Sequence, residues 1–174
     1  MEFGQFQVYT GDGKGKTTAA LGLALRASGA GLRVYFGQFL KEGEYGEIRA
    51  LRRIPNVTVE QYGSGKGLLL GRDAERDDRE CAREGYRRLS DALASGDYDV
   101  VIADEINCAM QCGLLVEQDL LDLADRRPED TELVYTGRGA TEALLKKADL
   151  ATEMRLIKHY FQDKQLPARE GIEK

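Results

Sequence analysis

Glycine and lysine alternate in a short stretch near the N-terminus. Residues 10–18 read TGDGKGKTT, and Gly15, Lys16 and Thr17 match the end of the pattern G-x-x-x-x-G-K-[ST]. Glycines allow main-chain N–H groups to converge on phosphate oxygens, and a helix that begins at the lysine adds its positive N-terminal end. The stretch therefore predicts a phosphate-binding loop.

The other residues of this loop have expected roles of their own. Threonine replaces the first glycine of the pattern, but Gly11 and Gly13 still supply flexible backbone. Lys16 is expected to reach the phosphates and the Thr17 hydroxyl to bind magnesium, while Lys14 adds a second positive charge. The alternative is a glycine-rich turn with incidental lysines. The order of strand, loop, GKTT and alanine-rich helix favours the phosphate loop.

Two carboxylates follow an apolar run in the middle of the chain. Residues 100–103 read VVIA, and Asp104 and Glu105 come directly after them. In proteins with a phosphate loop, an acidic residue at such a strand end holds the magnesium ion, directly or through water. Asp104 and then Glu105 are the candidates for this role. The alternative is that Asp104 only caps the turn that follows.

A third cluster comes after another expected strand. Residues 136–139 read TGRG, a glycine turn that carries Arg138. An arginine in such a turn at the edge of a sheet suits contact with a phosphate or another anion. The alternative is a solvent-exposed arginine in a tight turn.

The composition restricts the classes of function. The chain has 174 residues, a net charge of −5, 42% hydrophobic and 32% charged residues, which suits one globular domain and not a general nucleic-acid surface. Three cysteines and one histidine support a zinc site poorly, and reduced thiols in a cytoplasmic protein are the simpler interpretation. We expect no signal peptide and no membrane span, because no run approaches about 20 apolar residues.

Strand-like and helix-like segments alternate along the chain. This alternation predicts an α/β protein with a mostly parallel sheet flanked by helices, and the phosphate loop makes it a three-layer P-loop NTPase fold of the RecA-like type. One domain is expected over residues 1–174, with a polar tail at about 162–174. Strands are expected at residues 3–9, 32–40, 57–62, 98–103, 132–135 and 150–154, and helices at 16–28, 45–53, 73–94, 116–125 and 141–147.

Several motifs occur together in a characteristic order. They are GDGKGKTTAALGLALRASGAG, VYFGQFLK, VIADEIN, YTGRGA, ADLATEM and KHYF…GIE. The chain resembles the P-loop ATP:corrinoid adenosyltransferases over nearly its whole length. The resemblance implies that the cobalt(I) of a reduced corrinoid attacks the 5′-carbon of ATP, that triphosphate leaves, and that a 5′-deoxyadenosyl group remains on cobalt.

The resemblance also implies roles for particular residues. Lys16 and Glu105 are the expected catalytic residues, and Thr17, Glu105 and Asp104 the expected ligands of Mg²⁺ or Mn²⁺. Asp12 stands where the family usually has asparagine, near the ribose. The expected ATP-binding residues are Gly11, Asp12, Gly13, Lys14, Gly15, Lys16, Thr17, Thr18, Arg26 and Arg138.

One departure concerns the corrinoid. Members of the family often have an aromatic residue in the loop after the third strand, whereas residues 63–70 contain none. Leu68 and Leu69 are the candidates for its apolar role. The resemblance further implies a reductase that supplies cobalt(I) and a homodimer, with no nucleic acid and no membrane as partner.

Two other functions remain open from the sequence. One is a different P-loop enzyme, either an ATPase or a small-molecule kinase, although a kinase usually shows a lid with several arginines and a base near the acceptor hydroxyl. The other is a non-catalytic protein that binds ATP and a corrinoid, which the missing aromatic favours.

Overall fold

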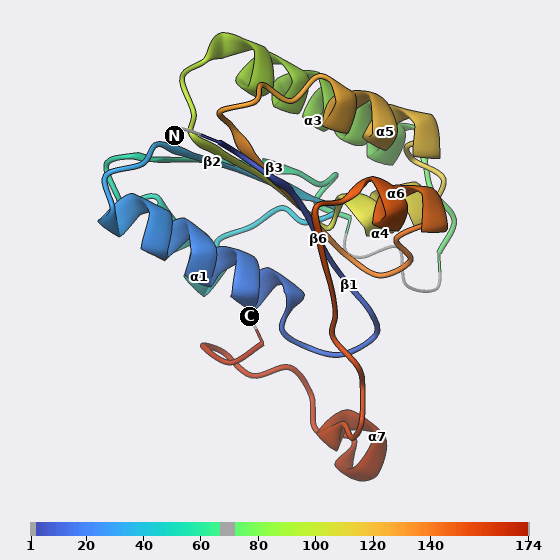
Figure 1. Ribbon diagram of the computed structural model, residues 1–174. Helices are drawn as coiled ribbons and strands as arrows, with labels where there is room; N and C mark the ends of the chain where they lie inside the picture. The colour runs from blue at the N-terminus through green and yellow to red at the C-terminus, as the bar shows by residue number, and fades with distance from the viewer. Residues whose placement is uncertain (1–2, 67–71, 174) are drawn as a thin grey trace.

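Six parallel strands form one sheet at the centre of the molecule (Figure 1). The computed structural model describes residues 3–66 and 72–173. The strands lie in the order β3-β2-β4-β5-β1-β6, and every neighbouring pair is parallel. They are β1 (Phe6–Thr10), β2 (Val34–Phe39), β3 (Val57–Tyr62), β4 (Val100–Asp104), β5 (Glu132–Thr136) and β6 (Leu150–Glu153). The expected α/β fold with a parallel central sheet is confirmed.

Helices cover both faces of this sheet. In Figure 1, α1 (Lys16–Gly29) lies on one face, and α3 (Arg76–Ser95) and α5 (Glu117–Asp125) lie on the other. The remaining helices are short: α2 (Gly46–Leu51), α4 (Ile106–Gln111), α6 (Glu142–Lys147) and α7 (Tyr160–Lys164). The sequence did not predict α4 and α7, although it predicted α2 and α6, which are equally short; over so few residues, helical periodicity is a weak signal. Among the helices of the described ranges, none is long and apolar enough to cross a membrane.

The central strands bury both of their faces. Val101 and Tyr135 belong to the larger core under α3 and α5, whereas Ile102 and Val134 belong to the core under α1. Successive residues of a strand point to opposite faces, so a strand covered on both sides needs apolar residues at every position. This explains why the run before Asp104 shows no alternation.

Two helical glycines differ in the space around them, which gives a matched pair of predictions. A Cβ at Gly85 in α3 would lie 2.6 Å from Tyr62 Cδ2 and 2.8 Å from Phe39 Cε1, whereas at Gly22 in α1 nothing lies within 4 Å. Gly85→Ala should destabilise the fold by about 1–3 kcal/mol through overpacking. Gly22→Ala should stabilise it by about 0.5–1 kcal/mol, since alanine loses less entropy in a helix.

Thermal unfolding of the two variants checks this difference. One kcal/mol corresponds to about 2–4 °C for a chain of this size. Shifts of the melting temperature in the same direction for both variants would contradict the described packing of α3 on the sheet.

Candidate active site

The loop between β1 and α1 is built around a buried lysine. Gly11 and Gly15 have φ values of 95° and 124°, in the left-handed region that favours glycine. Lys16 is only 7% exposed, and its Nζ donates to the carbonyl oxygens of Gly11 and Gly13, at 2.7 Å each. An ammonium group has three N–H donors, so one is left to bond a phosphate oxygen. Burial lowers the pKa of Lys16, and the negative charge of Glu105 partly opposes this.

The outer side of the loop packs against the chain that follows β6. Gly13 N–H donates to the Met154 carbonyl at 2.6 Å. A Cβ on Gly13 would lie 2.5 Å from that oxygen, and one on Gly11 would lie 2.6 Å from it. Backbone cannot give way as a flexible side chain can. The loop therefore needs glycine for this close approach as well as for any phosphate contact.

Asp104 and Glu105 have different surroundings. Asp104 is 0% exposed, and its two carboxylate oxygens accept hydrogen bonds from Thr136 Oγ1 at 2.6 Å and Gln38 Nε2 at 3.0 Å. Glu105 is partly exposed and has a left-handed backbone with φ 61°. Its charge acts on both Lys16 and Cys108. This geometry favours Glu105 as the carboxylate that faces a ligand of the loop.

The turn after β5 brings Arg138 to the same place. Arg138 N–H donates to Cys108 Sγ at 3.2 Å, and Arg138 Nε lies 3.9 Å from Asp12 Oδ1. The arginine side chain is 57% exposed, so this pair by itself adds little stability. Arg138 also lowers the pKa of Lys16, which confirms that the two cations lie near each other. The phosphate loop, Glu105 and Arg138 thus share one site at the carboxyl edge of the sheet.

Cys108 is the thiol of this site, and it is not activated. Burial, followed by the charge of Glu105 and a hydrogen bond to it, raises the pKa of Cys108 to about 12. The thiol therefore stays protonated at neutral pH and is a poor nucleophile.

Within the described ranges, no group of three or more His, Cys, Asp or Glu side chains could hold a metal ion.

Some expected site residues lie elsewhere. Arg26 is exposed in the last turn of α1, ten residues beyond Lys16, which is about 15 Å along a helix. The structure does not bring it beside the phosphate loop of the same chain. Thr17 is partly buried and Thr18 is exposed in the first turn of α1. The proposed corrinoid contacts, Leu68 and Leu69, lie outside the described residues.

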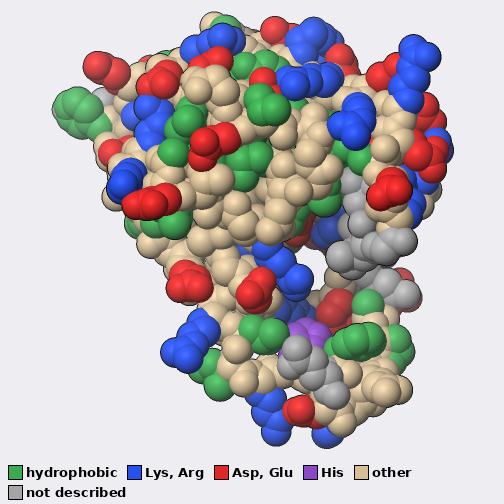
Figure 2. All heavy atoms as spheres, turned by 90° about the vertical axis from the view of Figure 1, so that its right-hand side faces the viewer, with side chains coloured by type: hydrophobic (Ala, Val, Ile, Leu, Met, Phe, Trp, Pro, Cys, Tyr) green, Lys and Arg blue, Asp and Glu red, His purple; other side chains and the backbone are tan. Residues whose placement is uncertain are grey.

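The C-terminal segment (residues 155–173) contacts the phosphate loop. The sequence did not predict this contact. Lys14 Nζ donates to Glu173 Oε1 at 2.9 Å, to the Ile172 carbonyl at 3.0 Å and to Tyr160 Oη at 3.4 Å. Glu173 also accepts from Arg169 and Tyr160. Figure 2 shows this segment as a lobe beside the main body, with Lys and Arg side chains along the hollow between them. Lys14 thus holds the C-terminal segment against the phosphate loop.

Removing the charge of Glu173 should loosen this segment. Its partners Arg169, Tyr160 and Lys14 lower the pKa of Glu173, so the contact is present at neutral pH and is lost as the pH falls below the usual range of a glutamate. We expect Glu173→Gln to raise the rate of tryptic cleavage within residues 155–169 about two- to five-fold at pH 7. Glu170→Gln is the control, because Glu170 pairs only weakly with Arg49, at 3.8 Å. Equal rates in the two variants would contradict the role of Glu173.

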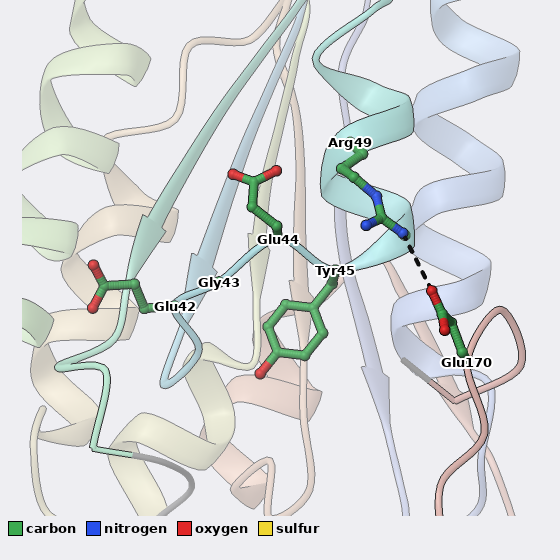
Figure 3. A pocket seen from close by; sticks show the side chains of 7 residues that line it. Glu42, Gly43, Glu44, Tyr45, Arg49 and Glu170 are labelled. Atoms are coloured by element: carbon green, nitrogen blue, oxygen red, sulfur yellow. Dashed lines mark ion pairs between the residues drawn. The ribbon is translucent and has the colours of Figure 1, made fainter.

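A pocket of about 270 Å³ lies at the same edge of the sheet, next to the C-terminal segment (Figure 3). Its wall comes from residues 42–46 after β2, from Arg49 of α2 and from Glu170. The Tyr45 ring points into the space between these residues, and Lys41 Nζ lies 5.8 Å from the centre of that ring. This pocket is separate from the residues of the phosphate loop.

Comparison with known proteins agrees with this geometry. The family model for ATP:corrinoid adenosyltransferase BtuR/CobO/CobP matches residues 2–173. The chain belongs to this family. The corrinoid adenosyltransferase of Pseudomonas aeruginosa is 34% identical over 173 residues, covering 99% of this chain and 84% of that protein. The corrinoid adenosyltransferase of Escherichia coli K12 is 32% identical over 172 residues, covering 99% and 86%.

A longer relative also matches. The uncharacterized protein all2391 of Nostoc is 38% identical over 169 residues, which cover 90% of this chain. The chain spans only 45% of the length of that protein.

Gln38 and Thr136 lie in the candidate site, and neither of them had a role assigned from the sequence. Each is a polar residue near the carboxyl end of its strand, and each is 0% exposed. A polar side chain at the carboxyl end of a buried parallel strand is a signal that could have found them, since ligands bind at that edge.

Proposed function

We propose that this protein transfers the 5′-deoxyadenosyl group of ATP to the cobalt(I) of a reduced corrinoid and releases triphosphate. The observation that carries the proposal is the match to the adenosyltransferase family over residues 2–173, together with a phosphate loop that holds Lys16 in place. In this reaction the C5′–O bond of ATP breaks and a cobalt–carbon bond forms. The electron pair of the broken bond leaves with the triphosphate.

The described side chains suit a reaction whose leaving group is a polyanion. Lys16, the N-terminal end of α1 and Arg138 place positive charge around the position that the triphosphate would occupy. Groups held in place before the reaction stabilise charge that develops on the leaving group without further reorganisation. We propose that the loop residues Gly11, Asp12, Gly13, Lys14, Gly15, Lys16, Thr17 and Thr18 bind ATP, and that Arg138 contacts the phosphates.

The reaction does not require an activated protein nucleophile, and none lies beside the loop among the described residues. Cys108 is the thiol whose charge would act on Lys16, and its raised pKa keeps it protonated. A kinase would instead need a base near an acceptor hydroxyl. In the proposed reaction the attacking atom belongs to the substrate, so the protein needs no nucleophile of its own and positions the 5′-carbon for attack.

We propose Mg²⁺, or Mn²⁺ in its place, as the metal that accompanies ATP. The residues at hand fit such an ion: Thr17 offers a hydroxyl and Glu105 a carboxylate at the same edge of the sheet. Mg²⁺ is usually held by one or two protein oxygens together with substrate phosphates and water, and not by an all-protein cage. When bound, the ion neutralises charge on the triphosphate.

Further parts of the proposal rest on the resemblance. They are a reductase partner that supplies cobalt(I), a homodimer, a cytoplasmic location, contact of Arg26 with ATP, and corrinoid contacts from Leu68 and Leu69. Several apolar side chains, Leu150 and Phe161 among them, are exposed at the edge strand β6 and in the C-terminal segment, which is compatible with a second copy covering them. Sedimentation velocity measures the oligomeric state directly.

One assay separates the proposed reaction from its alternatives. The protein is incubated anaerobically with a reduced corrinoid and Mg-ATP, and the corrinoid spectrum and the phosphate products are followed. We expect an adenosylated corrinoid and one triphosphate per turnover. ADP or orthophosphate as the product would indicate another ATPase or a kinase. Tight ATP binding without turnover would indicate a non-catalytic ATP- and corrinoid-binding protein.

A further inference from the structure

Three buried polar side chains lie next to one another across the carboxyl edge of the sheet. Gln38, Asp104 and Thr136 come from the adjacent strands β2, β4 and β5, and each is 0% exposed. Gln38 Nε2 donates to Asp104 Oδ2 at 3.0 Å, and Thr136 Oγ1 donates to Asp104 Oδ1 at 2.6 Å. Gln61 Nε2 donates to Gln38 Oε1 at 3.0 Å, which orients the Gln38 amide toward Asp104. The hydrogen bonds therefore run in one direction, from Gln61 through Gln38 to Asp104.

The Thr136 hydroxyl has two partners, and they are consecutive residues. It donates its one hydrogen to the Asp104 carboxylate, and it accepts the main-chain N–H of Glu105 at 2.9 Å. Both partners are buried or partly buried, so neither can exchange this bond for bulk water at no cost. A single side chain thus ties the carboxylate of one residue to the backbone of the next.

Glu105 needs such a support. Its backbone has φ 61° and ψ 17°, a left-handed conformation that a residue with a side chain adopts only when its surroundings impose it. The residue stands at the junction of β4 and α4, and this conformation turns the chain out of the sheet. The Glu105 carboxylate then acts on Lys16 and Cys108.

We infer that Thr136 is a positioning residue: its hydroxyl holds Glu105 in the left-handed conformation that aims the Glu105 carboxylate at the metal–triphosphate. Asp104 acts as a buried anchor for that hydroxyl, because both of its oxygens are already bonded within the sheet. Gln38 supports Asp104 from the other side. This inference rests on the proposed function, since it assigns the metal-facing role to Glu105.

Mn²⁺ binding to the protein–ATP complex tests the inference without a corrinoid. Free Mn²⁺ is measured by electron paramagnetic resonance during titration of the wild type, Thr136→Val and Thr136→Ser. Valine has nearly the shape of threonine but lacks the hydroxyl, and serine keeps it. We expect Thr136→Val to weaken Mn²⁺ binding roughly 10- to 100-fold, the usual effect of removing an outer partner of a metal ligand. Thr136→Ser should stay within about three-fold of the wild type.

Binding of ATP without a divalent cation, measured in the presence of a chelator, is the internal control. It should change less than about three-fold in Thr136→Val, because the phosphate loop itself is intact. Wild-type Mn²⁺ affinity in Thr136→Val, or an equal loss in Thr136→Ser, would overturn the inference. An equal loss of metal-free ATP binding would also overturn it, because that result indicates general damage.

A second variant keeps the test decisive if Thr136→Val does not fold. Gln38→Met removes the donor on the opposite oxygen of Asp104, and Mn²⁺ binding should fall about three- to ten-fold. An unchanged Mn²⁺ affinity in Gln38→Met would then reject the network as a support of Glu105. Failure of the proposed function is a separate result, since it appears as a wild type that makes no adenosylated corrinoid.

Discussion

Replacing Lys16 with alanine should lower the affinity for ATP by about 100-fold. The lysine is buried in the loop and donates to the carbonyls of Gly11 and Gly13, so its ammonium is already in place for a phosphate. Hydrogen bonds to charged groups contribute about 1.5–3 kcal/mol, and each 1.4 kcal/mol is a factor of ten in affinity. The variant also leaves two carbonyl oxygens of the loop without their donor.

Isothermal titration calorimetry with Mg-ATP measures this change. Lys146→Ala is a control for the loss of a lysine, because Lys146 is exposed and pairs with Glu142 within α6. Lys14→Ala is the more informative comparison, since Lys14 is bonded to the C-terminal segment, and we expect a loss of only about ten-fold there. Wild-type ATP affinity in Lys16→Ala would contradict the assignment of the phosphate loop.

Glu105→Gln should lower the rate of adenosyl transfer by about 100- to 1,000-fold. That is the usual effect of removing one group that stabilises charge in the transition state. The amide keeps the size of the side chain and loses the negative charge that a metal ion next to the triphosphate requires. The buried network of Asp104 and Thr136 does not contain this carboxylate, so the fold should be preserved.

Turnover and Mn²⁺ affinity together check this prediction. Mn²⁺ binding to the Glu105→Gln complex with ATP should weaken, while the melting temperature stays within about 2–4 °C of the wild type. Glu129→Gln is the control, because Glu129 is exposed and precedes β5, at the opposite edge of the sheet. Full activity of Glu105→Gln would indicate that Asp104, and not Glu105, faces the metal ion.

Much of the fold could be predicted from the order of local patterns. The apolar run before Asp104 and the glycine-rich loop before Lys16 each have a local cause, because burial on both faces and close approach of backbone restrict residue types. The expected element ends were displaced by one to three residues in several places, for example at β1, which spans Phe6–Thr10 and not residues 3–9. Helix α4 was missed, since its six residues span fewer than two turns and give a weak periodic signal.

The site was predicted only in part. The loop motif identified Lys16. The strand end placed Asp104 before Glu105 as the candidate, whereas the resemblance favoured Glu105. Their environments differ because Thr136 and Gln38, from other strands, bond Asp104 and leave Glu105 at the turn. The contact of Lys14 with Glu173 was also unpredictable, as the two residues are 159 positions apart.

Local patterns were sufficient to predict a phosphate loop in a parallel α/β fold and a resemblance to the corrinoid adenosyltransferases. Those conclusions depend on residues that are neighbours in the chain, where glycine geometry and strand burial act locally. The packing of distant strands was needed to show which carboxylate is free to face a ligand, which lysine is buried and which one holds the C-terminal segment. Such distinctions depend on hydrogen-bond partners from distant strands, and sequence spacing does not record them.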